Sequence, residues 1–167
     1  MKACSKTFIG VAATALLTLI IVYLLTPDYD TPESREAFLK QENHNSKVLY
    51  EETFGDYVIC VSRNDMGEGY HLFKNMLGKF RFDHSNYSNT GGVKGYLEQD
   101  GQVYLIHTNF RECAKYFEIV YYDFESSEEV CRDRIDLNDQ LTIVPILSDN
   151  GIWNTLIFYD AGGNQIS

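Results

Sequence analysis

Three histidines lie among the strand-like segments of the chain, and they are the first candidates for acid–base or metal chemistry. His71 occurs in "GYHLFK", His107 occurs in "YLIHTN", and His84 ends a third segment. Imidazole titrates near neutral pH and is a common metal ligand. A joint site would need three neighbouring strands, which the spacing of the histidines does not require. We therefore expect scattered histidines and no metal or cofactor site.

The tripeptide "DHS" at 83–85 contains the three residue types of a hydrolase triad. Adjacent side chains of a strand point to opposite faces, whereas a triad is assembled from positions that are distant in sequence. No G-x-S-x-G or H-E-x-x-H motif occurs. The sequence thus predicts no catalytic residue and no enzyme. The alternative is an unrecognised surface hydrolase that uses one of the three histidines with a nearby acid.

Three cysteines follow the apolar N-terminal segment and belong to the part of the chain expected in an oxidising compartment. Cys60 lies in the apolar run "YVICVS" and is expected to be a small buried residue. Cys113 and Cys131 lie in the more polar stretches "FRECAKY" and "EEVCRDR". They form the candidate disulfide pair, although sequence does not establish the geometry.

Aromatic residues are abundant, with 12 Tyr, 10 Phe and one Trp. A tyrosine ring is apolar while its hydroxyl is polar, which suits glycan and peptide binding. Most aromatic residues of the C-terminal half fall in strand-like runs, so we assign to the core Tyr116, Phe117, Tyr121, Tyr122, Phe124, Trp153, Phe158 and Tyr159. Tyr87, in the polar stretch 85–92, remains a candidate for a ligand-binding loop.

From Lys47 onward, short segments rich in Tyr, Phe, Val and Ile alternate with turn residues, which is the signature of strands and hairpins. The pair Asp100-Gly101 predicts a tight type I′ turn. The strands are expected at 47–54, 56–63, 69–75, 78–83, 93–98, 102–108, 115–124, 129–136, 141–147 and 153–160. The predicted fold is a mainly β, antiparallel meander that forms a sandwich or a barrel-like domain.

Alternation within the strands indicates how they are covered. In 102–108, Val103 and Leu105 share one face, while Tyr104 and Ile106 share the other. Strands that are apolar on both faces belong in a sandwich, a barrel or a covered sheet. Pro145 has no amide hydrogen to donate, which predicts an edge strand or a bulge at that position.

The N-terminal stretch 8–25, "FIGVAATALLTLIIVYLL", contains no charge. As a helix it would be roughly 27 Å long, close to the roughly 30 Å of a hydrocarbon core. Lys2 and Lys6 precede it and acids follow it, which predicts a cytoplasmic N-terminus and an external C-terminal part. The bulky residues 23–25 do not suit a signal-peptide cleavage site. We therefore expect a retained anchor, with a cleaved signal and a secreted domain as the alternative.

A second helix is predicted after this segment, because Thr31, Pro32 and Glu33 form a helix start signal. A helix from 32 to 43 has too few apolar residues for a core of its own and is expected to be a stalk or a lid. The expected organisation is a cytoplasmic N-terminus and transmembrane signal anchor at 1–27, a stalk or short helix at 28–46, and an extracytoplasmic β domain at 47–167.

Charge limits the class of partner. Residues 28–167 contain 12 basic and 24 acidic residues, giving a formal charge of −12. Such a surface repels phosphate backbones and argues against nucleic acid. A basic protein or a component of the cell envelope fits better, and the oligomeric state is left open.

Three segments, "GDYVICVSR", "GYHLFKNMLGKFRF" and "NTLIFYDAGGNQI", together with the N-terminal apolar run, resemble small uncharacterised membrane-anchored or exported proteins of Gram-positive bacteria. Lys74 and Gly78 match a Lys-x-x-x-Gly hairpin, and Asp160 and Gly163 match an Asp-x-x-Gly turn element. The resemblance implies structure and no activity. The expected function is that of a membrane-tethered extracytoplasmic binding or interaction module.

Overall fold

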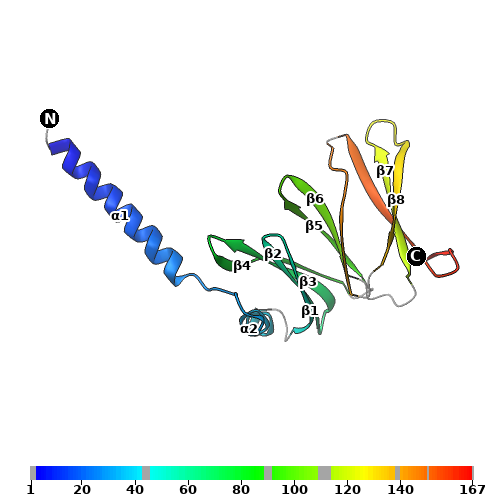
Figure 1. Cartoon of the computed structure of the whole chain (residues 1–167), viewed down its shortest axis with the longest axis horizontal. Helices are drawn as coiled ribbons and strands as arrows, with labels where there is room; N and C mark the ends of the chain where they lie inside the picture. Colours follow the sequence, from blue (N-terminus) through cyan, green and yellow to red (C-terminus); the bar gives the residue numbers. More distant parts are fainter. Residues whose placement is uncertain are drawn as a thin grey trace.

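The computed structural model describes residues 3–42, 46–88, 92–108, 114–137, 140–149 and 151–166. In these ranges two helices precede a series of strands (Figure 1). The elements are α1 (Ala3–Leu25), α2 (Pro32–Glu42), β1 (Lys47–Phe54), β2 (Tyr57–Asn64), β3 (Gly67–Met76), β4 (Lys79–Ser88), β5 (Val93–Gln99), β6 (Gln102–Thr108), β7 (Tyr116–Asp123), β8 (Glu129–Asp136), β9 (Leu141–Pro145), β10 (Ile152–Tyr159) and β11 (Gln165–Ile166).

The strands form three antiparallel sheets. Sheet A has the order β1-β2-β3-β4, sheet B the order β5-β6-β9, and sheet C the order β11-β10-β7-β8. The prediction of a mainly β, antiparallel chain is therefore confirmed, and each of the ten predicted segments overlaps a strand. The two-residue strand β11, which pairs with the end of β10, was not predicted because it is too short to show a period.

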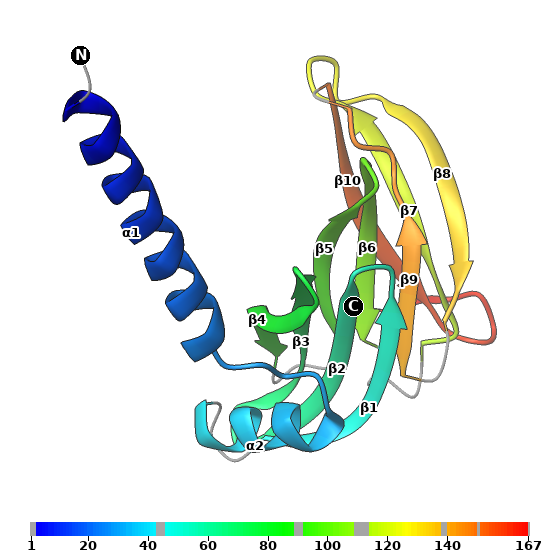
Figure 2. The same cartoon turned by 60° about the vertical axis from the view of Figure 1, so that its left-hand side comes forward.

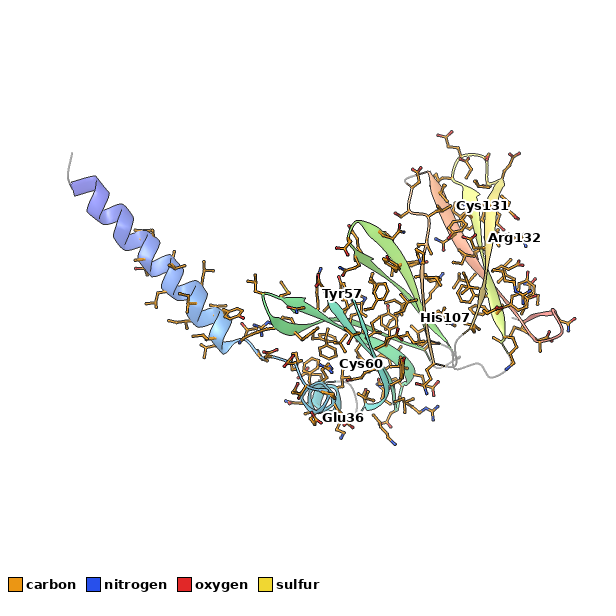
Figure 3. The ribbon with its side chains drawn as sticks, viewed as in Figure 1. Glu36, Tyr57, Cys60, His107, Cys131 and Arg132 are labelled. Atoms are coloured by element: carbon orange, nitrogen blue, oxygen red, sulfur yellow. The ribbon has the colours of Figure 1, made fainter. Side chains whose placement is uncertain are left out.

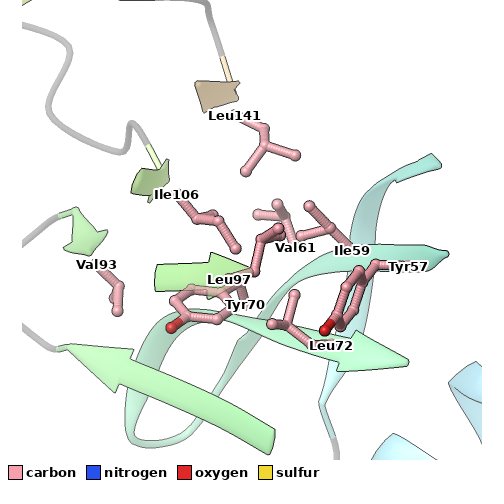
Figure 4. Packing of buried hydrophobic residues seen from close by; sticks show 9 residues of the cluster. All are labelled: Tyr57, Ile59, Val61, Tyr70, Leu72, Val93, Leu97, Ile106 and Leu141. Atoms are coloured by element: carbon pink, nitrogen blue, oxygen red, sulfur yellow. The ribbon is translucent and has the colours of Figure 1, made fainter. Parts of the chain in front are cut away.

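Sheet B is the middle layer, and one of its faces packs on sheet A (Figure 4). Tyr104 and Ile106 lie on this side. Val103 and Leu105 lie on the other side, in a cluster shared with sheet C. The predicted two-sided burial of this strand is confirmed. Pro145 ends β9, which is an edge strand of sheet B, as its missing amide hydrogen predicts.

Close packing between sheets A and B involves a glycine of β5. A Cβ atom on Gly95 would collide with the hydroxyl of Tyr70, a side chain that is buried in the same cluster. Glycine therefore allows the tyrosine to lie directly against the backbone of sheet B.

Helix α2 covers the outer face of sheet A (Figure 2). Thr31 accepts a hydrogen bond from the Ser34 amide at 3.2 Å, which caps the helix start that the sequence predicts. Leu39 is fully buried, and the ring of Phe38 lies 6.1 Å from that of Phe73 in β3. Helix α2 is thus a lid packed on the β domain rather than a separate stalk.

Helix α1 extends away from the sheets (Figures 1 and 2). The buried residues that the structure describes form three core clusters, and none of these clusters includes a residue of α1. All three described core clusters therefore lie C-terminal to α1. Within the described ranges, no helix is long and apolar enough to cross a membrane.

Candidate functional site

The outer face of sheet C carries aromatic and charged side chains that contact one another. Phe117, Ile119 and Tyr121 of β7 point inward to the core between sheets B and C. Because side chains alternate along a strand, Tyr116, Glu118, Val120 and Tyr122 point outward. With their neighbours on β8 and β10 they form the surface that we call the aromatic face, defined by Tyr116, Glu118, Tyr122, Arg132, Arg134, Trp153 and Tyr159.

Two stacked ring pairs lie across strands β7 and β10. Tyr116 is opposite Tyr159, with ring centroids 4.8 Å apart and planes at 9°. Tyr122 is opposite Trp153, with centroids 4.4 Å apart and planes at 18°. Cross-strand aromatic pairs stabilise a sheet and fix the ring orientations. The face therefore presents ordered rings.

Charged groups surround the Tyr116–Tyr159 pair. Arg132 donates to Glu118 at 2.7 Å and makes a two-bond contact with Glu129 at 2.7 and 2.8 Å. The hydroxyl of Tyr159 donates to Glu118 at 2.9 Å, and the guanidinium of Arg134 lies 3.7 Å from the ring centroid of Tyr116. The hydrogen bond to Glu118 raises the pKa of Tyr159, and the hydrogen bond from Arg132 lowers the pKa of Glu129.

These contacts hold the long side chains in place before any partner arrives. Val120, on the same face, is fully buried beneath them although no further layer covers sheet C in the described structure. A surface that is already ordered pays little side-chain entropy when it binds, and Tyr, Trp and Arg are the residues that dominate binding energy in protein interfaces. The aromatic face is therefore suited to contact another macromolecule.

Part of the predicted core assignment was wrong. Phe117, Tyr121 and Phe158 are core residues, but Trp153 is 41% exposed and Phe124 is 72% exposed. The physical reason is that sheet C is covered on one face, so outward residues such as Trp153 have no second layer over them, while Phe124 lies in the turn that follows β7. The available signal was the alternation of "YFEIVYYD", in which Glu118 shares a face with Tyr116 and Tyr122.

The three histidines do not converge. His71 of β3 lies on the α2 side of sheet A, opposite Cys60 in the register. His84 pairs with Leu72 on the opposite side of that sheet and contacts its neighbour Asp83 at 2.9 Å. His107 lies between sheets B and C (Figure 3), with its ring centroid 5.0 Å from that of Phe158.

His71 is the centre of a buried polar cluster. Its Nε2 lies 2.6 Å from the hydroxyl of Ser62 and 2.9 Å from the hydroxyl of Tyr87, which in turn lies 2.8 Å from Ser46. Ser62 and His71 are both fully buried, and burial lowers the pKa of His71 to about 4. A serine–histidine contact is typical of nucleophilic catalysis, but these two side chains have no access to substrate and the described partners of His71 include no acid.

Tyr87 lies at a different place from the one predicted. Strand β4 continues to Ser88, so Tyr87 is a strand residue rather than a loop residue. Its hydroxyl is hydrogen-bonded to His71 in the buried polar cluster. The Asn- and Ser-rich sequence predicted a loop, but pairing of β4 with β3 overrides that local preference.

A second buried polar group lies beneath α2. Arg35 of the helix donates two hydrogen bonds to Glu51 of β1, at 2.8 and 3.1 Å. The thiol of Cys60 donates to the same carboxylate at 3.1 Å, and burial raises its pKa. The prediction that Cys60 is buried is confirmed (Figure 3). This group fixes the position of α2 on sheet A.

Of the two cysteines in the predicted disulfide, Cys131 is among the described residues. Cys131 lies on β8 and packs against the core between sheets B and C. Cys113 lies outside the described residues, so the pairing stays a prediction. Across the described ranges no group of three His, Cys, Asp or Glu side chains could hold a metal ion.

No protein-family model matches the chain, and neither a curated protein nor a solved structure matches it. Functional conclusions therefore rest on the geometry of the aromatic face and of the buried polar groups.

Proposed function

We propose that this protein is a membrane-tethered extracytoplasmic binding module and that its partner contacts the aromatic face. The observation that carries the proposal is the outward exposure of stacked Tyr and Trp rings on the uncovered side of sheet C, where ion-paired Arg132 shares the Glu118 carboxylate with Tyr159. The three sheets form a sandwich, and the middle sheet B supports sheet C, which carries the aromatic face.

The tether is the apolar run 8–25. It is uncharged over 18 residues, with basic residues before it and acidic residues after it. Most large apolar side chains of α1 between Val11 and Leu25 are exposed in the isolated chain, and water is a poor solvent for such a surface. A bilayer would remove this surface from water, with the N-terminus on the cytoplasmic side.

The partner is a protein, and its charge is basic. The formal charge of −12 on residues 28–167 attracts a basic partner from a distance, while the aromatic face supplies contact area. A component of the cell envelope with a basic surface meets both conditions. Nucleic acid does not, because its phosphates are repelled by the same charge.

Photo-crosslinking in intact cells tests the binding face. A benzophenone amino acid replaces Trp153 in one variant and Tyr50 of β1 in the control, because these two side chains are similarly exposed at 41% and 37%. We expect a protein adduct from position 153 and none from position 50. The captured protein is then identified and purified for a direct affinity measurement.

In that measurement, truncation of Trp153 to alanine should weaken binding about 30-fold, the effect of losing one strong interface residue. Tyr50→Ala should leave the affinity unchanged. Equal affinity of the wild type and Trp153→Ala would refute the aromatic face as the binding site, whatever protein had been captured.

Topology is tested separately. Single cysteines at positions 4 and 86 are labelled in intact cells with a reagent that does not cross membranes, and the cells are then extracted with carbonate. Labelling at 86 alone, with full-length protein kept in the membrane, supports the tether. A shortened chain in the medium would instead favour the cleaved and secreted form.

A further inference from the structure

The tip of the β3–β4 hairpin carries Leu77, a residue type that neither the turn conformation nor burial in the core requires at this position. Leu77 and Gly78 both have positive φ angles, 56° and 81°, as a type I′ turn requires. The corresponding turn between β5 and β6 uses Asp100 and Gly101, with nearly the same angles of 54° and 77°. Aspartate tolerates this conformation, whereas a bulky leucine is disfavoured there.

Leu77 is also 88% exposed, and the adjacent Met76 is 55% exposed. A leucine that is strained in the backbone and exposed to solvent destabilises an isolated domain. Asparagine or aspartate would serve the turn better. The residue therefore points to a contact with something apolar outside the chain.

The hairpin tip lies against the end of α1. The hydroxyl of Tyr23 donates to the carbonyl oxygen of Leu77 at 2.8 Å. An apolar pocket of about 480 Å³ between them is lined by residues that include Leu19 and Ile20 of α1 and Met76 and Leu77 of the tip. Since Leu19 precedes Leu25 by six residues, roughly 9 Å of helix, the tip lies beside the last turns of the apolar run.

Basic side chains surround the tip. Residues 74–82, "KNMLGKFRF", contain Lys74, Lys79 and Arg81 and no acid, in a domain where acids outnumber basic residues. The ammonium of Lys79 lies 3.2 Å from the Tyr23 carbonyl oxygen and 4.6 Å from the centroid of its ring. Tyrosine and lysine beside an exposed apolar tip are typical of the boundary between lipid and water.

We propose that the β3–β4 hairpin tip inserts into the outer leaflet of the membrane, next to the point where α1 leaves it. Met76 and Leu77 enter the apolar boundary, and Lys74, Lys79 and Arg81 bind the phosphate groups of the lipids. The inference rests on the proposed membrane tether, because the depth of the tip is set by its contact with α1. The hairpin is then a second attachment that orients the β domain.

The inference is tested on the full-length protein in vesicles of phosphatidylcholine with one quarter phosphatidylglycerol. Cys4, Cys113 and Cys131 are replaced by serine, and the buried Cys60 is kept. An environment-sensitive fluorophore is attached to a single new cysteine at position 77. Position 100, at the equivalent turn of β5–β6, is the matched control, and position 16 in α1 reports on the tether. Lipids that carry a quencher in their acyl chains then report contact with the hydrocarbon.

The expected result is strong quenching at positions 16 and 77 and none at position 100. Quenching at 16 with no quenching at 77 would overturn the hairpin inference while the tether stands. No quenching at 16 would overturn the tether and the inference together. Equal quenching at 77 and 100 would also overturn the inference, because the contact would then not be specific to this hairpin.

Discussion

The buried histidine at the centre of sheet A makes folding stability depend on pH. His71 is fully buried, and the described groups within hydrogen-bond distance of its Nε2 are the hydroxyls of Ser62 and Tyr87. Burial disfavours the charged imidazolium and lowers the pKa of His71 from 6.5 to about 4. In the unfolded chain the same side chain keeps its ordinary pKa.

The direction and size of the effect follow from these two values. Between pH 6.5 and about 4 the unfolded chain binds a proton at this position that the native protein does not bind, so stability falls as the pH falls. Below pH 4 this difference lowers the free energy of unfolding by about 3 kcal/mol relative to neutral pH. Between pH 7 and pH 5 the free energy of unfolding falls by about 2 kcal/mol. Carboxylates with lowered pKa values, such as Glu51, affect stability below this window.

Urea denaturation of residues 28–167, which contain all three described core clusters, provides the measurement at pH 7 and pH 5. The wild type should lose about 2 kcal/mol of unfolding free energy at the lower pH. His71→Asn should be less stable at pH 7 but should lose little on acidification. His84→Asn is the matched control, because His84 is exposed, and it should retain the wild-type pH dependence. An equal acid-induced loss in the wild type and in His71→Asn would refute the reasoning.

Three further substitutions are measured by the same denaturation assay at pH 7. Arg35→Ala leaves the Glu51 carboxylate beneath α2 without a cation and should lower the free energy of unfolding by about 2 kcal/mol. Lys40→Ala is its control, because it removes an exposed ion pair and should have little effect. Gly95→Ala forces the backbone of β5 away from the buried Tyr70 and should lower the free energy of unfolding by about 2 kcal/mol. Gly151→Ala is its control, because a Cβ there meets open space. Leu77→Asn should stabilise the domain by about 1 kcal/mol, because asparagine tolerates positive φ. A destabilised Leu77→Asn would show that leucine serves the fold itself.

The strands were predictable because their signal is local. Alternation of Val103, Tyr104, Leu105 and Ile106 within one segment shows two apolar faces, and that pattern requires cover on both sides of the strand, which sheets A and C provide. The turn at Asp100-Gly101 was predictable for the same reason, since its two residues determine the backbone angles.

The aromatic face was missed because its exposure depends on topology. Tyr122 and Trp153 are as apolar in sequence as the core residues beside them. They become surface residues because sheet C has no further layer on its outer side, a fact that depends on which sheets pack together. The contact of Ser62 with His71 was missed for a similar reason, because it joins two strands across a register that sequence does not specify.

The order of the layers determines how the two proposed contacts relate. The hairpin tip belongs to sheet A and the aromatic face to sheet C, with sheet B between them (Figure 1). Packed sheets lie about 10 Å apart, so the aromatic face is about 20 Å beyond sheet A, whereas charges in solution are screened over roughly 8 Å at physiological ionic strength. A hairpin held at the lipid surface therefore directs the aromatic face away from the membrane and beyond the reach of its surface charge. The partner should then meet the face from the external solution, and substitutions at the tip should change how the domain is oriented without changing the intrinsic affinity of the face.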